Sequence, residues 1–189
     1  MKITDKIIVR ELAKRYMELA TDEKQKKMDQ RMQDINDLKL VRPPVLLDEI
    51  PWYQMDIDGE LTCECEDPAV RQVENALRIA LYRRKHFRAD TLFEPFWRVT
   101  MAYDSTGIGI QVNEQTLWTD DTNNIVSHSY QDLFEDEESV ELIKIPTFTA
   151  RPDIDAQAMN FYTDLFGDAM PVKLCGRGYM YYNTKKLRK

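Results

Sequence analysis

The sequence predicts an α/β fold in which parallel βαβ units follow a helical N-terminal segment. Residues 1–39 carry apolar side chains at helical spacing, whereas short apolar runs alternate with a well-capped helix between residues 40 and 97. Strand, helix and strand in this order are typical of a parallel sheet. Short β-prone runs in residues 98–130 interrupt the alternation and predict an insertion of antiparallel hairpins.

The composition indicates a soluble globular protein and argues against nucleic-acid binding. The chain has 189 residues, 43% hydrophobic and 31% charged, which predicts a soluble globular domain with a sizeable core. Its net charge of −7 argues against a nucleic-acid partner, because binding phosphates requires a basic face. The sequence contains no long apolar run and no signal peptide, so we expect a cytoplasmic protein that does not enter a membrane.

Residues 1–39 are expected to form two helices, or one helix with a break near Thr21. The first has an amphipathic stripe. The second begins at Asp22, which with Gln25 resembles a capping box. Its apolar side includes Met28 and Met32, which are typical of plain core, although methionines also line adaptable binding surfaces.

A first strand is predicted after two prolines. Pro43 and Pro44 exclude a helix, and the apolar run that ends at Leu47 suits a short buried strand. Asp48 and Glu49 follow directly. Acidic pairs at strand ends are usually solvated or capping groups, but in a parallel barrel that end faces the active site.

The most strongly specified helix starts at Asp67 and Pro68, an N-cap followed by proline at the first helical position. It is expected to run to about Arg84, where basic residues suit the negative end of the helix dipole. Residues 89–97 are then expected to form the next strand and its terminal loop, completing a βαβ unit.

Beyond the hairpins, the acidic residues 135–138 are interpreted as the first turn of a short helix, with a cation site as the alternative. Residues 155–166 predict a second crossover helix that stops at Gly167. A buried strand at 170–176 follows, and residues 183–189 form a basic tail. That strand is expected to open a new βα unit, so the chain is expected to end within its fold.

Short catalytic motifs are absent from the sequence, and only two histidines occur. His86 suits a helix end, and His128 should share a strand face with Tyr130, so both are interpreted as structural. The odd count of three cysteines argues against disulfides. Cys63 and Cys65 stand at strand spacing, but a zinc site needs two further ligands, so no metal site is expected in this chain.

The order of elements resembles the N-terminal half of the uroporphyrinogen decarboxylase superfamily, which includes corrinoid-dependent and coenzyme M methyltransferases. The resemblance spans residues 40–182. It is carried by Arg42–Leu47 as the first strand, Ala89–Phe96 with its Pro-Phe pair as the second, Gly107–Val112 as the segment before the hairpins, and Pro171–Gly178 as the third strand and its glycine-bearing loop. The resemblance implies a partial (β/α)8 TIM barrel.

Two departures from the decarboxylases bear on the substrate. Their arginine-rich loop after the first strand is replaced here by Asp48-Glu49-Ile50-Pro51-Trp52, which argues against a polycarboxylate porphyrinogen. Their aspartate after the second strand has no clear equivalent, although Glu94 is near. The zinc ligands of the methyltransferases, a His-x-Cys and a later Cys, belong to the second half of the barrel.

The resemblance therefore implies a truncated member of the superfamily, inactive alone, whose full-length form is a corrinoid-linked methyltransferase or a tetrapyrrole decarboxylase relative. Zinc or a corrinoid would be the cofactor of the full-length form, with none in this chain. The expected partners are a complementary barrel half or further copies of the chain, and, once completed, a small molecule, a tetrapyrrole or a corrinoid protein.

Candidate site residues follow from the predicted strand ends at the mouth of the barrel. Asp48 and Glu94 are the candidate catalytic acids or bases. The candidate substrate-binding residues are Glu49, Trp52, Trp97, Lys173, Cys175 and Arg177. The alternative function is a stand-alone, non-catalytic α+β module that binds a protein through its acidic surface and the helix of Met28 and Met32.

Overall fold

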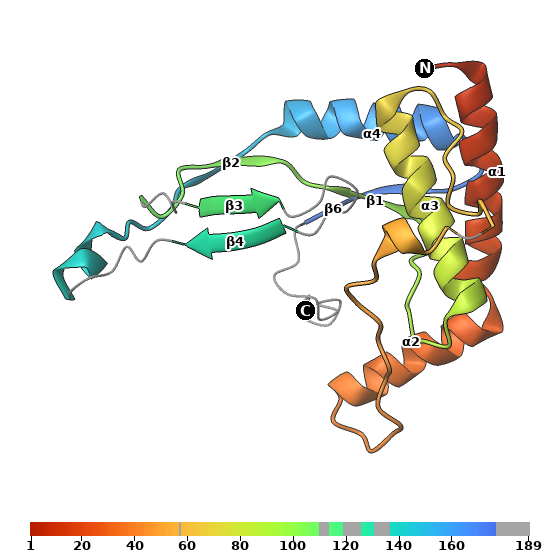
Figure 1. The fold of residues 1–189 in the computed structure, drawn as a ribbon, viewed down its shortest axis with the longest axis horizontal. Helices are drawn as coiled ribbons and strands as arrows, with labels where there is room; N and C mark the ends of the chain where they lie inside the picture. The colour runs from red at the N-terminus through yellow and green to blue at the C-terminus, as the bar shows by residue number, and fades with distance from the viewer. Residues whose placement is uncertain (57, 110–113, 119–125, 131–136, 177–189) are drawn as a thin grey trace. The chain divides into compact units, whose positions relative to one another are not determined.

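A computed structural model describes residues 1–56, 58–109, 114–118, 126–130 and 137–176 (Figure 1). The chain divides into two compact units, one formed by Met1–Thr100 together with the chain from Asp155 onward, the other by Met101–Ile154. The fold is mixed α/β, and the described residues contain four α-helices and three two-stranded sheets, one of them parallel. The mixed class is as predicted, and no closed barrel is formed by these residues.

Two helices form the N-terminal segment, α1 (Ile3–Ala20) and α2 (Glu23–Asn36). Asp22 caps α2, since its Oδ1 accepts a 2.6 Å hydrogen bond from the backbone N–H of Gln25. The Gln25 side chain is buried and donates to the carbonyl of Thr91 at 3.4 Å. The break near Thr21 is therefore confirmed, and Asp22 supplies the reason for it.

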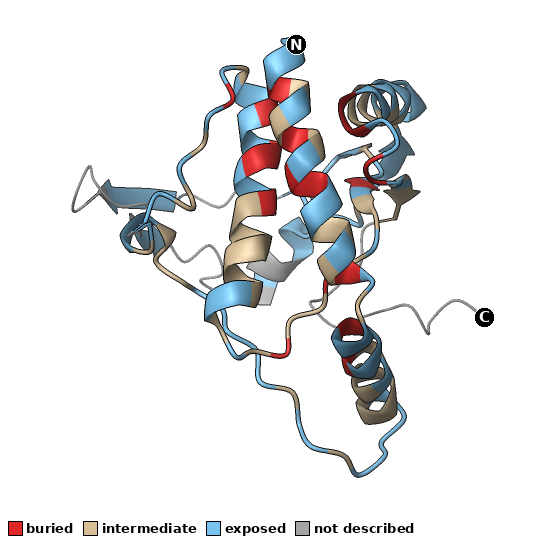
Figure 2. Cartoon of the chain, turned by 90° about the vertical axis from the view of Figure 1, so that its right-hand side faces the viewer, coloured by how far each residue is buried: buried red, intermediate tan, exposed pale blue. Residues whose placement is uncertain are grey.

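The hydrophobic core of the first unit lies between α1 and α3 (Pro68–His86), which run side by side with their buried residues facing each other (Figure 2). The predicted start of α3 is confirmed, because Asp67 Oδ1 accepts from the N–H of Ala69 at 3.0 Å. The end of α4 (Pro152–Phe166) completes this core. The buried core residues are Val9, Leu12, Ala13, Cys65, Val70, Val73, Leu77, Leu165, Phe166, Ala169 and Met170.

Arginine 10 of α1 holds the end of α4 in place. Arg10 Nε donates to the carbonyl of Leu165 at 2.9 Å, and its terminal NH2 donates to that of Asp164 at 2.8 Å. Gly167 follows with φ of 58°, the left-handed conformation that ends the helix as predicted.

One parallel strand pair is present, formed by β1 (Trp97–Thr100) and β6 (Val172–Cys175). The chain between them includes the second unit and α4. The strand predicted at 170–176 is thus confirmed at Val172–Cys175, although its residues are half-buried or exposed and not buried as predicted. The strand predicted at 89–97 is corrected, since pairing begins only at Trp97. Pro95 lacks the N–H that a ladder needs, which explains the late start.

The strand predicted at Arg42–Leu47 is not formed; this segment is irregular, and its Leu46 is exposed. Two hydrogen bonds nevertheless connect it to the segment before β1. The N–H of Asp90 donates to the carbonyl of Val45 at 2.7 Å, and the N–H of Val45 donates to Asp90 Oδ2 at 2.9 Å. Because Pro43 and Pro44 offer no donors, a longer ladder cannot form on their side.

The second unit contains two antiparallel pairs. β3 (Glu114–Trp118) and β4 (Val126–Tyr130) form one antiparallel hairpin within the range where hairpins were predicted, whereas β2 (Tyr103–Ser105) pairs with the later β5 (Phe148–Ala150). A short 3₁₀ helix, η2 (Glu137–Leu142), follows the hairpin, and the first two residues of the acidic run 135–138 lie outside the described residues. Part of Gly107–Val112 also lies outside them. Within the described ranges, no helix is both long and apolar enough to cross a membrane.

Candidate functional site

The outer face of the parallel pair is polar and charged. Arg98 and Lys173 are partners in register, and strand alternation places them with Thr100 and Cys175 on one face. Trp97, on the opposite face, packs its ring 5.2 Å from that of Phe166 in α4. The sheet therefore has one face against α4 and one that is open, where Arg98, Thr100 and Lys173 are exposed.

Glu94 lies next to this open face, three residues before β1. Its two carboxylate oxygens are held by Arg98, with Nε donating to Oε2 at 2.9 Å and a terminal NH2 donating to Oε1. These hydrogen bonds raise the pKa of Arg98 above its ordinary value. An arginine fork of this kind fixes the direction of both groups.

Tyr16 of α1 lies beside Glu94, where its hydroxyl interacts with the Glu94 backbone and feels the charge of the carboxylate. Burial raises the pKa of Tyr16 to about 12, and the charge of Glu94 adds to the rise. The Tyr16 ring also makes an edge contact with Phe93, with 5.9 Å between the centroids. Helix α1 thereby supports the segment that carries Glu94.

Phe96 separates the two cations of the face. Lys173 Nζ lies 4.3 Å from the centroid of the Phe96 ring, and the Arg98 guanidinium carbon lies 5.8 Å from it. Arg98 is paired with Glu94, but among the described residues no carboxylate lies within ion-pair distance of Lys173. The Cys175 thiol donates to the carbonyl of Lys173 at 3.7 Å. The face thus carries one neutralised cation, one available cation and a thiol.

The other predicted site residues have different surroundings. Asp48 is exposed and accepts from the N–H of Glu49 at 3.0 Å, where Glu49 has φ of 52°. Trp52, in the 3₁₀ helix η1 (Trp52–Gln54), packs on the end of α3 with its ring centroid 6.2 Å from that of Tyr82. Trp97 faces α4, and Arg177 lies outside the described residues.

The structure therefore brings together Glu94, Lys173 and Cys175 from the predicted set. It also corrects the reason for choosing Glu94, which precedes its strand and does not follow it. Sequence reasoning missed Arg98 and Phe96. Strand alternation about Trp97 would have found Arg98, whereas the contact of Phe96 with Lys173 depends on the pairing of β1 with β6.

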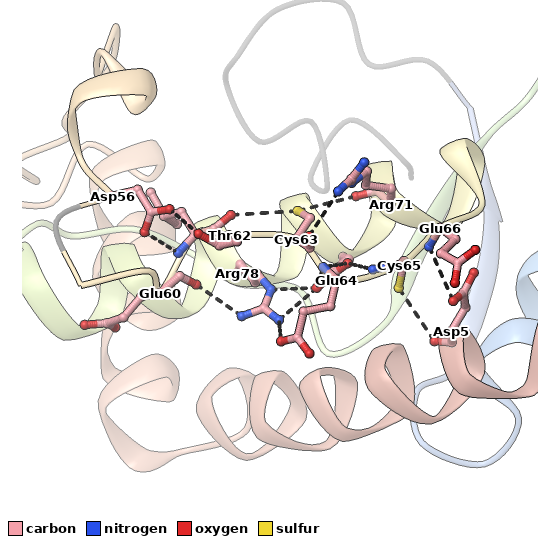
Figure 3. A network of polar contacts seen from close by, with 12 residues as sticks. Asp5, Asp56, Glu60, Thr62, Cys63, Glu64, Cys65, Glu66, Arg71 and Arg78 are labelled. Atoms are coloured by element: carbon pink, nitrogen blue, oxygen red, sulfur yellow. Dashed lines mark hydrogen bonds and ion pairs between the residues drawn. The ribbon is translucent and has the colours of Figure 1, made fainter.

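Cys63 and Cys65 belong to a separate polar network that joins the chain before α3 to α1 and α3 (Figure 3). Glu74 of α3 is completely buried and accepts from the N–H of Cys65 at 2.8 Å and from Arg78 Nε at 2.8 Å. Asp5 of α1 accepts from the N–H of Asp67 at 3.1 Å. Buried carboxylates that accept backbone N–H groups are structural anchors.

The thiols of this network are poorly suited to act as nucleophiles. Burial raises the pKa of Cys65 to about 12, with Glu74 adding to the rise, and burial also raises the pKa of Cys63. Both are therefore protonated at neutral pH, whereas the thiolate is the reactive and metal-binding form. Across the described part of the chain, no three His, Cys, Asp or Glu residues are grouped as metal ligands.

Each histidine pairs with a glutamate. His86 Nε2 lies 3.1 Å from Glu60 Oε1, and the His86 ring lies tilted by 38° against the Tyr82 ring, with 4.1 Å between the centroids. In the hairpin, His128 Nδ1 contacts Glu114 across the strands, and its ring stacks with Tyr130. The prediction that His128 and Tyr130 share a face is confirmed.

Comparisons with protein-family models, with curated proteins and with solved structures gave no match to this chain.

Proposed function

We propose that residues 40–182 are the opening βα units of a barrel of the uroporphyrinogen decarboxylase type, and that this chain is inactive by itself. The observation that carries the proposal is the parallel pairing of β1 with β6, connected by a chain that returns through α4. Parallel neighbours joined through a helix are the repeating unit of (β/α)8 barrels.

The order of the predicted strands adds support. Val45 of the first predicted strand is hydrogen bonded to Asp90, in the segment that leads into β1, and β1 pairs with β6. The segment at Val45 is irregular and forms no ladder, so this contact supports only a position beside the chain that leads into β1, which is where a barrel would place its first strand. In the complete barrel, the remaining strands would pair with the outer edge of the Val45 segment and with the outer edge of β6.

The full-length form is proposed to be a cytoplasmic, corrinoid-linked methyltransferase or a tetrapyrrole decarboxylase relative. We favour the methyltransferase, because the acidic Asp48–Trp52 loop offers no arginine to a polycarboxylate. Lys173 and Cys175 would contact substrate from the face of β6 that points away from α4. Glu94, held by Arg98, would reach the substrate from the start of β1 and not from the C-terminal strand ends at which barrel sites usually lie. Zinc or a corrinoid would be bound by the remaining half of the barrel.

Reconstitution tests this proposal. The DNA that follows the Lys189 codon is read in all frames for further barrel strands, and the encoded segment is co-expressed with this chain. We expect a soluble one-to-one complex that binds cobalamin, measured by absorbance after gel filtration. A chain that is monomeric, melts cooperatively and gains no cobalamin binding from the added segment would contradict the proposal.

A substitution in the reconstituted protein tests the proposed base. Glu94→Gln should reduce turnover by at least about tenfold, since general acid–base groups contribute this much or more. Glu23→Gln is the matched control, because Glu23 pairs only locally with Lys26 on the exposed side of α2. Equal turnover in both variants would remove Glu94 from the mechanism.

The alternative of a non-catalytic protein-binding module is favoured by one observation, the exposed apolar residues Leu38, Leu40 and Leu46 between α2 and η1. The binding face would be this segment, because Met28 is only 5% exposed and cannot line an open surface. A folded monomer without cobalamin or tetrapyrrole binding would support the module.

A further inference from the structure

The open face of β1 and β6 has an unbalanced charge. Arg98 and Lys173 are two cations in register, and Glu94 is the single carboxylate within ion-pair distance of either among the described residues. The chain as a whole carries a net charge of −7, so a cationic patch stands out against its surface. A local excess of positive charge attracts small anions.

The face already binds one carboxylate of its own. Glu94 occupies the fork of Arg98, which shows that the geometry of this guanidinium suits a planar carboxylate. Lys173 has the Phe96 ring beneath its ammonium group instead of an anion. Thr100 adds an exposed hydroxyl on the same side of the sheet.

We infer that this face binds the carboxylate of a small apolar acid, with the oxygens at Lys173 and the apolar part against Phe96. The inference names the substrate class of the proposed site and so rests on the proposed function. A ligand with one negative charge balances the ammonium of Lys173, because Arg98 is already paired with Glu94. An apolar body suits the Phe96 ring, which is half-buried beside Lys173.

Benzoate is the probe, and benzamide is its neutral counterpart of the same shape. The full 189-residue chain is labelled with ¹⁵N and titrated with each, following the Arg98 Nε–H signal and the backbone signals of β1 and β6. We expect saturable shifts with benzoate that weaken at high salt, and no such shifts with benzamide. Equal binding of the two compounds would overturn the inference.

Three variants locate the site. Lys173→Gln should weaken benzoate binding about tenfold, as expected for the loss of a charge-assisted hydrogen bond. Lys24→Gln, on the exposed side of α2, should leave binding unchanged. Glu94→Gln should tighten binding, because it frees Arg98 from its internal carboxylate.

The opposite signs of the Lys173 and Glu94 variants separate a site effect from loss of folding, since an unfolded variant cannot bind more tightly. Wild-type affinity in Lys173→Gln would reject the site. The titration needs no second barrel half, so benzoate binding with failed reconstitution would reject the barrel proposal alone. Reconstitution without benzoate binding would reject the carboxylate site alone.

Discussion

The Glu74 carboxylate is the centre of the network that joins the chain before α3 to the helix. It accepts from the N–H groups of Glu64 and Cys65 and from Arg78, and its side chain is inaccessible to solvent. Glu74→Gln should lower the free energy of unfolding by about 3 kcal/mol, because a largely buried guanidinium loses its buried partner and keeps only the exposed Glu64. Urea unfolding at neutral pH measures the loss.

Glu64→Gln is the matched control, since Glu64 pairs with the same Arg78 but its side chain is 65% exposed. It should lose far less stability, because solvent screens an exposed pair. Equal losses in the two variants would contradict the assignment of Glu74 as the anchor.

The lowered pKa of Glu74 makes the free energy of unfolding depend on pH. Burial opposes the charged form, but the hydrogen bonds from the Cys65 and Glu64 amides prevail and lower the pKa of Glu74. The stabilisation is therefore complete above the unfolded-state value of about 4.3 and is lost as pH falls through the lower folded-state pKa. The stability difference between wild type and Glu74→Gln should be constant above that value and shrink below it.

At the scale of elements, the segment between Leu38 and Glu49 depends on one buried carboxylate. Both bounding residues have left-handed backbones, with φ of 59° and 52°. Two residues within the segment donate to the Asp90 carboxylate, the N–H of Val45 at 2.9 Å and a terminal NH2 of Arg42. Arg31 of α2 donates to the same carboxylate at 3.0 Å. The segment is thus held from the middle.

Asp90→Asn should release this segment, because an amide keeps the shape but loses the charge that Arg31 and Arg42 contact. Hydrogen exchange at the Val45 amide should become at least about tenfold faster, as expected for a local opening. Asp29→Asn, whose carboxylate accepts from Gln33 within α2, should leave this rate unchanged. Unchanged exchange in Asp90→Asn would show that Asp90 does not hold the segment.

The helices could be predicted from the sequence, whereas the first strand and part of the site could not. The helices were predictable because each signal is local, such as Asp67 with Pro68 at the start of α3 and Gly167 at the end of α4. The strand before Asp48 failed because an apolar run specifies extended chain but does not supply a pairing partner. The site was predicted in part. Lys173 was chosen because it lies in the strand predicted at 170–176. The pairing of Arg98 with Glu94 could not be chosen in this way, because it depends on how the chain bends at Pro95 between the two residues.

At the scale of the whole molecule, the chain divides into two compact units. The sequence predicted an inserted β-rich segment, but its predicted bounds differ from those of the second unit. The predicted insertion spanned residues 98–130, whereas the second unit spans Met101–Ile154. The added part includes β5, whose pairing with β2 joins segments far apart in sequence. Local turn signals identify hairpins between neighbouring strands, and they give no indication of such a distant partner.

The division into units predicts that the first folds without the second. Replacing Met101–Ile154 by a flexible Gly-Ser linker should leave the urea midpoint of the remaining chain close to its wild-type value. The cut removes only the first three residues of α4, and Asp155 then supplies a side chain suited to capping the shortened helix. The core around Leu77 and Phe166 remains complete.

Near-ultraviolet circular dichroism and urea unfolding check this outcome, because the contact of Trp97 with Phe166 lies wholly within the first unit. A cooperative transition with a retained tryptophan signal would show that the parallel pair and its polar face form independently. The carboxylate titration could then be repeated on the shortened chain. Loss of the cooperative transition would mean that β1 and α4, which flank the excised part, need the second unit in order to fold.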